Sequence, residues 1–180
     1  GGSTMKRLIL IVLLMFVALF TLADEWYSID GFYLLTPDGI RVEEAPGTGG
    51  RRIDFFFPGE SAPGARGLLV QATDRLAPQD AALVGLFELL RGSAPPEGNS
   101  IVGMRNTPGP ERGEAETRIV MLGVGTVEDT ELWPSWIVEL GPTPGGLYTH
   151  LVVLPYAPAE EGENYLEALL ETLEVEIAEA

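Results

Sequence analysis

The most regular alternation of hydrophobic and polar residues lies between residues 114 and 155, where three stretches predict consecutive β-strands. These stretches are Glu114–Val124, Trp133–Leu140 and Leu147–Leu154. In the middle stretch Trp136, Val138 and Leu140 alternate with Ser135, Ile137 and Glu139, which predicts a strand with one wetter face. The last stretch is apolar almost throughout, as in a central strand that is buried on both faces. We therefore expect a meander of three strands, with its last strand near the centre of a sheet.

Two further stretches have the residue spacing of helices. Pro78–Arg91 begins with a proline, which suits the first helical position, and is followed by Gly92, which suits the position after the last turn. Its apolar residues cover most of the circumference, which favours a helix that is covered on more than one side. Glu160–Leu173 places leucines on one face and glutamates on the opposite face. A short edge strand is expected after it, at Val175 and Ile177.

The first half of the chain predicts more strands. Trp26–Leu35 and Ile40–Glu44 flank Thr36-Pro37-Asp38-Gly39, a strong turn sequence, so we expect these two segments to pair as a hairpin. Further strands are predicted at Arg51–Phe57, Gly67–Thr73 and Ile101–Arg105, and a mobile loop at Asn106–Gly113. Together these elements predict an α+β fold, in which a twisted antiparallel sheet packs against two main helices.

The N-terminal residues predict export. Gly1–Thr4 precede the first methionine and have the appearance of a cloning scar. Residues 5–23 then contain Lys6-Arg7, an apolar run from Leu8 to Phe20 and small residues up to Ala23. This order is typical of a secretory signal peptide that is cleaved after Ala23, which leaves residues 24–180 as a single α+β domain in the periplasm or outside the cell.

An uncleaved membrane anchor is the alternative for the same segment. As a helix, residues 8–23 span about 24 Å, which is shorter than the ~30 Å hydrocarbon core of a bilayer. If residues 8–23 are retained, the domain contacts a membrane while it stays outside the cytoplasm.

The chain is strongly acidic, with 27 Asp and Glu against 11 Lys and Arg and a net charge of −16. No Lys or Arg follows Arg118. This charge argues against a nucleic-acid partner, because binding to phosphates needs a cationic surface. It is compatible with a cationic protein or a divalent cation as partner, and also with a surface that only keeps the chain in solution. The chain has no cysteine, which excludes disulfides, thiolate zinc sites and cysteine nucleophiles.

Few residues offer chemistry. His150 is the single histidine, and a hydrolase built around it would need a nucleophile or a carboxylate nearby. Glu128, Asp129 and Glu131 cluster in one loop and could bind a hard cation, although their spacing is not that of an EF-hand. Trp133 is expected to be more exposed than Trp136, so Glu128, Asp129, Glu131 and Trp133 form a tentative partner surface. No catalytic, cofactor-binding or metal-binding residue is predicted, and no cofactor is expected.

Several stretches carry a resemblance to a known family. They are the strand Gly145–Leu151, the loop Pro155–Gly162, the helix and short tail at Tyr165–Val175, and the opening Trp26–Leu35 with its turn sequence. In this order they resemble the Mog1/PsbP-like fold, which includes bacterial DcrB-like extracytoplasmic domains. The resemblance implies a protein without enzymatic activity, such as an extrinsic subunit or an assembly factor, and it supplies no catalytic residues.

The sequence therefore predicts an exported, non-catalytic binding or assembly module that acts through protein–protein contacts. A membrane-anchored or self-assembling structural subunit is one alternative. A small hydrolase built around His150 is the other.

Overall fold

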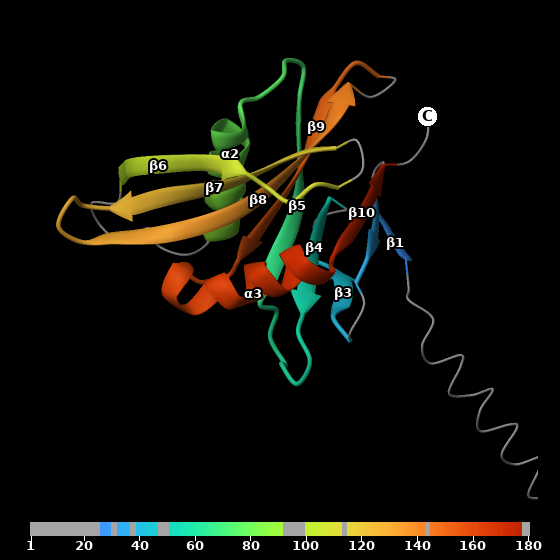
Figure 1. The fold of residues 1–180 in the computed structure, drawn as a ribbon, viewed down its shortest axis with the longest axis horizontal. Coiled ribbons are helices and arrows are strands. Elements are labelled where there is room, and N and C mark those ends of the chain that lie inside the picture. Colours follow the sequence, from blue (N-terminus) through green and yellow to red (C-terminus); the bar gives the residue numbers. More distant parts are fainter. Residues whose placement is uncertain are drawn as a thin grey trace, which may run out of the picture.

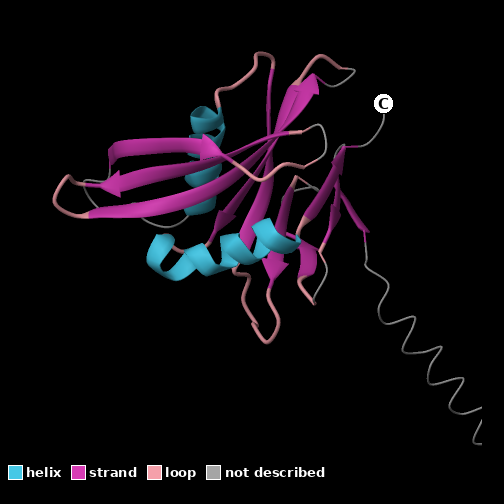
Figure 2. Cartoon of the chain, viewed as in Figure 1, coloured by secondary structure: helices cyan, strands magenta, loops and turns pink. Residues whose placement is uncertain are grey.

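The computed structural model describes residues 26–29, 32–36, 39–46, 51–91, 100–112, 115–142 and 145–177. The described residues form mostly antiparallel β-sheet with two helices, which agrees with the predicted α+β class (Figures 1 and 2). Residues 5–23, including the predicted cleavage position at Ala23, lie outside the described part of the chain.

The strands make two sheets. The smaller sheet has the order β1-β2-β10, and the larger one has the order β3-β4-β5-β9-β8-β7-β6. The strands are β1 (Trp26–Ile29), β2 (Phe32–Leu35), β3 (Arg41–Glu44), β4 (Arg52–Phe56), β5 (Ala65–Ala72), β6 (Ser100–Pro108), β7 (Glu116–Gly125), β8 (Thr130–Pro142), β9 (Tyr148–Pro155) and β10 (Glu174–Ile177). The helices are α2 (Pro78–Leu90) and α3 (Ala159–Thr172). The predicted meander, both predicted helices and the short strand after the second helix are therefore confirmed.

Strand β9 lies at the centre of the large sheet, between β5 and β8, and is buried on both faces. Leu151 and Val153 pack with α3 and the small sheet, whereas Val152 and Leu154 pack under α2. Because successive side chains of a strand point to opposite faces, this one apolar run supplies two hydrophobic cores. The prediction of a central strand is confirmed.

Helix α2 begins at Pro78 and lies close against the sheet. A Cβ atom added to Gly85 would come within 2.7 Å of Val152, so the helix backbone approaches the strand at this glycine. Its opposite side leaves Val84 and Phe87 exposed, the latter by 65%. The expectation of a helix covered on more than one side is wrong for the described residues, because only the sheet covers α2.

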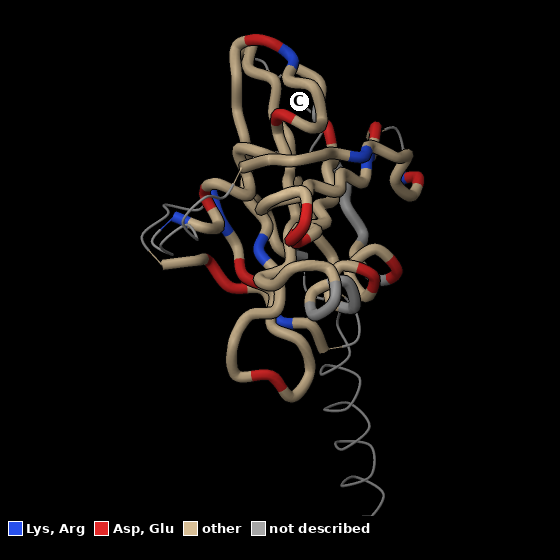
Figure 3. The backbone as a smooth tube through the Cα atoms, turned by 90° about the vertical axis from the view of Figure 1, so that its left-hand side faces the viewer, with Lys and Arg blue, Asp and Glu red and all other residues tan. Residues whose placement is uncertain are grey.

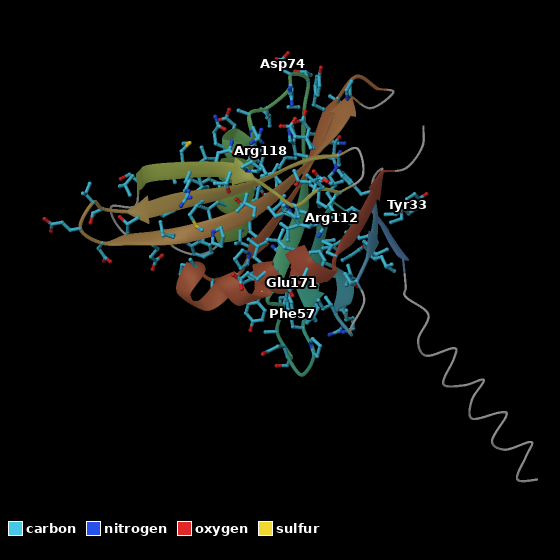
Figure 4. All side chains as sticks on the ribbon, in the orientation of Figure 1. Tyr33, Phe57, Asp74, Arg112, Arg118 and Glu171 are labelled. Carbon is cyan, nitrogen blue, oxygen red and sulfur yellow. The ribbon has the colours of Figure 1, made fainter. Side chains whose placement is uncertain are left out.

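Helix α3 lies on the other face, and an arginine caps its C-terminal end. Arg112 donates from Nε to the carbonyl oxygen of Leu173 at 3.2 Å and from Nη2 to that of Leu170 (Figure 4). The guanidinium also lies 5.6 Å from the Trp136 ring. A cation at this end of a helix satisfies carbonyls that lack an internal partner and opposes the helix dipole. Arg112 thereby ties the end of β6 and its following residues to α3.

The predicted hairpin around residues 36–39 is wrong. Strands β1 and β2 pair with each other, with Ile29 opposite Phe32, and only Asp30-Gly31 lies between them. Asp-Gly is a strong two-residue hairpin sequence, and here it takes precedence over the later Pro-Asp-Gly. Strand β3 pairs instead with β4 in the large sheet, so the stretch at residues 36–39 connects the two sheets.

The predicted loop at Asn106–Gly113 is wrong in its first part. Strand β6 continues to Pro108 and pairs with β7, with Asn106 opposite Val120 and Pro108 opposite Arg118. A proline is compatible with this strand because, among the described strands, β6 is at the edge of the sheet and one side of its backbone has no partner.

A polar network joins the central strands on the side of β4. Asp54 is buried and accepts from Arg66 Nε at 2.9 Å and from the Tyr156 hydroxyl at 2.6 Å. Burial, and then the hydrogen bond to Asp54, raise the pKa of Tyr156. The network satisfies three polar groups at a place where each would otherwise be costly to bury.

Asp54→Ala is expected to lower the free energy of unfolding by about 2 to 4 kcal/mol, because it leaves Arg66 and the Tyr156 hydroxyl without their acceptor. Urea unfolding followed by circular dichroism measures this change. Glu43→Ala is the matched control, since its ion pair with Arg41 is exposed and should contribute less than about 1 kcal/mol. Equal losses for the two variants would contradict this account of the network.

A candidate binding groove on the meander

A groove of about 550 Å³ lies on the outer part of the large sheet, across β6, β7 and β8. Its apolar lining comes from Ile119 and Met121 on β7, Leu132 on β8, Val102 and Met104 on β6, and Val127 in the loop between β7 and β8. Arg105 and Thr107 line it as well.

The register of β7 explains which face carries the groove. Val120 and Leu122 are buried under α2, so Ile119 and Met121, which alternate with them, face the opposite side of the sheet. Helix α3 covers that side only in part, because it packs mainly on β8, β9 and β5, whereas α2 also reaches β6 and β7 (Figure 1). The outer strands therefore have a helix on one face and an open groove on the other.

Several lining residues are large, apolar and exposed. Val127 is 90% exposed, Met104 53% and Leu132 47%. Single exposed apolar residues are common, but a group that lines one concavity is typical of a binding surface.

The loop beside the groove carries the carboxylates that the sequence analysis singled out. Glu128, Asp129 and Glu131 are exposed there. Backbone hydrogen bonds in both directions between Thr126 and Asp129, at 2.9 and 3.2 Å, fix the turn. Val127 and Thr130 alternate with these acids and line the groove, so the carboxylates form an acidic rim next to an apolar floor. No group of three acidic or histidine side chains in the described residues is arranged to hold a metal ion.

Trp133 does not belong to this exposed surface, although it is slightly more exposed than Trp136, as expected. The side chain is only 6% exposed and packs in the core under α2. Strand β8 begins at Thr130, three positions before the predicted start, and its alternation turns Leu132 toward the groove and Trp133 away from it. The sequence reasoning also missed Leu132; continuing the strand alternation back through the acidic loop would have pointed to it.

His150 lies on β9 and is fully buried. Neither ring nitrogen makes a hydrogen bond of normal geometry with the described residues, although the Leu76 backbone is near enough to influence the ring. Burial lowers the pKa of His150, and the nearby charge of Glu139 offsets this effect only in part. This placement gives no support to a hydrolase built around His150, because such a residue needs contact with a substrate.

A second cavity, which is polar and has a volume of about 470 Å³, lies near the start of α2, and two arginines line it. Arg75 donates to Glu139 at 2.7 Å and to Glu116 at 3.0 Å, and Arg118 pairs with Glu116 at 3.2 Å. The arginines are therefore neutralised by carboxylates of the same surface, which makes this cavity a poor site for an anion.

Comparison with known proteins leaves the function open, since the chain matches no protein-family model and no curated protein. No helix in the described residues is long and apolar enough to cross a membrane. The resemblance to the Mog1/PsbP-like fold therefore stays a prediction.

His150 should make the stability depend on pH. Its pKa is lower in the folded chain than in the unfolded chain, so below pH ~6.5 the unfolded state binds more protons and stability falls as the pH falls. His150→Leu should remove this contribution, which is at most about 1.4 kcal/mol per pH unit. Urea unfolding at several pH values between 7.5 and 5.5 measures the slope.

The control for this experiment is Val152→Ala, on the same strand. It should lower stability by a similar amount at every pH and keep the wild-type slope, since it removes no titratable group. An unchanged slope in His150→Leu would mean that His150 does not titrate as its burial requires.

Proposed function

We propose that this chain is an exported, non-catalytic binding module that docks a protein partner in the groove of β6, β7 and β8. The observation that carries the proposal is the apolar groove itself, with Val127 and Leu132 exposed along it. Apolar residues gathered in one concavity favour a ligand that buries them.

The surroundings of the groove suit a protein partner. Its floor belongs to strands paired along their length, so the surface is already formed before binding. The acidic rim at Glu128, Asp129 and Glu131 and the net charge of −16 favour a cationic partner and speed its approach. Figure 3 shows how acidic positions outnumber basic ones along the described backbone.

The N-terminal sequence supports export, because Lys6-Arg7, the following apolar run and Ala23 have the order of a signal peptide. We also propose that the domain is related to the Mog1/PsbP-like fold, where an extrinsic or accessory role would use a surface of this kind. A self-assembling subunit is the second candidate, with another copy of the chain in the groove. Repulsion between two copies that each carry −16 weighs against it.

Photo-crosslinking in the native host tests the proposal. A photoreactive amino acid at Arg105, which lines the groove, should give one discrete adduct with another protein. Leu132→Glu in the same chain should abolish that adduct, because it places a charge on the apolar floor. The matched control is a photoreactive residue at Phe87, which is also exposed but lies on α2, on the other face of the sheet.

An adduct from Phe87 but none from Arg105 would refute docking in the groove. An adduct of two copies of this chain would instead support the self-assembling subunit.

A further inference from the structure

We infer that the partner binds as an added β-strand, paired with the free edge of β6. This inference rests on the proposed function of the groove and specifies how the partner is held. Strand β6 is the last strand of the large sheet, and no strand in the described residues pairs with its outer side (Figure 1). Its nine residues are almost all exposed or half-buried.

The two edges of the sheet differ in how they are protected. The opposite edge, β3, has four residues, and Arg41, Glu43 and Glu44 make three of them charged. Short length and charge are the usual means of preventing further strands from pairing. Strand β6 is twice as long and carries one charge, Arg105. It is therefore the edge that is open to another strand.

The register shows which backbone groups are available. The Gly109 N–H donates to the Thr117 carbonyl at 3.0 Å, and in an antiparallel pair such bonded positions alternate with positions that face outward. The backbone groups of Arg105 and Thr107 therefore point toward β7. Those of Met104, Asn106 and Pro108 point away from it. Pro108 lacks an N–H at an outward position, so the pairing edge ends there.

The groove lies directly beside this edge. Arg105 and Thr107 of β6 line it, and Gly103 between Val102 and Met104 has open space where a side chain would be. A strand paired with β6 directs every second side chain to the groove face. An apolar side chain opposite Gly103 could therefore lie over β6 toward the groove floor.

The charges select the composition of the added strand. The Ser100 hydroxyl donates to the Gly125 carbonyl at 3.3 Å, which places the acidic loop at the start of β6. Lysine or arginine at that end of the partner strand would meet Glu128 and Asp129, whereas Arg105 further along disfavours a basic residue near it. The occupant is thus an extended segment of a protein, apolar on one face and basic at one end.

A capped peptide of alternating valine and threonine, with two lysines at one end only, is the probe. Titration calorimetry with the full chain should show binding that weakens as salt increases. Glutamates in place of the lysines should weaken it about tenfold or more, because they face the acidic rim.

The edge is tested by a pair of variants at one position. Asn106→Pro removes an outward N–H and should weaken peptide binding about tenfold, whereas Asn106→Ala removes only the side chain and should leave binding unchanged. A peptide N-methylated at alternate amides should also fail to bind the wild-type chain, which keeps the test valid if Asn106→Pro folds poorly.

The outcomes separate this inference from the proposed function. Peptide binding that is indifferent to Asn106→Pro and to N-methylation, or no binding of the lysine peptide at all, overturns strand addition. If the groove at Arg105 still gives its protein adduct, the proposed function stands without it. If the photoreactive residue at Arg105 gives no protein adduct, the proposed function itself is refuted.

Discussion

Burial of β9 on both faces is the constraint on which the rest of the structure depends. An apolar strand can be covered twice only if it lies inside a sheet and if a separate layer packs on each side. Helix α2 is one layer, and α3 with the small sheet is the other. The neighbours β5 and β8 are held in register by the same requirement, because a shift of one residue would exchange the two cores.

The groove exists because the two layers do not cover the same strands of the large sheet. The cover given by α2 extends from β9 to β6, whereas that of α3 stops near β8. Strand alternation continues beyond that point, so Met121 on β7 is placed as a core residue without a helix over it, whereas Ile119 still packs in part against the core of α3. Helix α2 covers one face of β7. Apolar side chains on the part of the other face that α3 does not reach are left to contact a ligand or water.

Much of this fold could be predicted from sequence, because strong periodicity in the meander and in α3 reflects burial directly, and a proline and a glycine mark the ends of α2. The errors came where pairing depends on the rest of the molecule. Two turn sequences lie close together at residues 30–31 and 36–39, and only the packing of two sheets decides which one closes a hairpin. Strand β6 has little alternation because it is an edge, so its residues 106–108 resembled a loop.

The candidate site was predicted only in part, for a related reason. The acids of the β7–β8 loop were identified because charge is visible in any sequence, but the apolar floor beside them was not. Leu132 and Trp133 are adjacent, and because the strand was expected to begin only at Trp133, Leu132 was not placed on it. Exposure of an apolar side chain depends on whether a distant helix reaches it, which one strand's sequence does not record.

The acidic composition acquires a physical role from the open edge of β6. An exposed, nearly uncharged edge strand invites pairing with identical strands, which leads to aggregation. Here every copy carries −16, and the acidic loop lies beside the start of the edge, so another copy is repelled over the distances at which strands must first align. A basic segment meets no such barrier. The same negative charge thus opposes self-association and favours a basic strand as the partner. Raising the ionic strength should weaken both the repulsion between copies and the attraction of the basic strand.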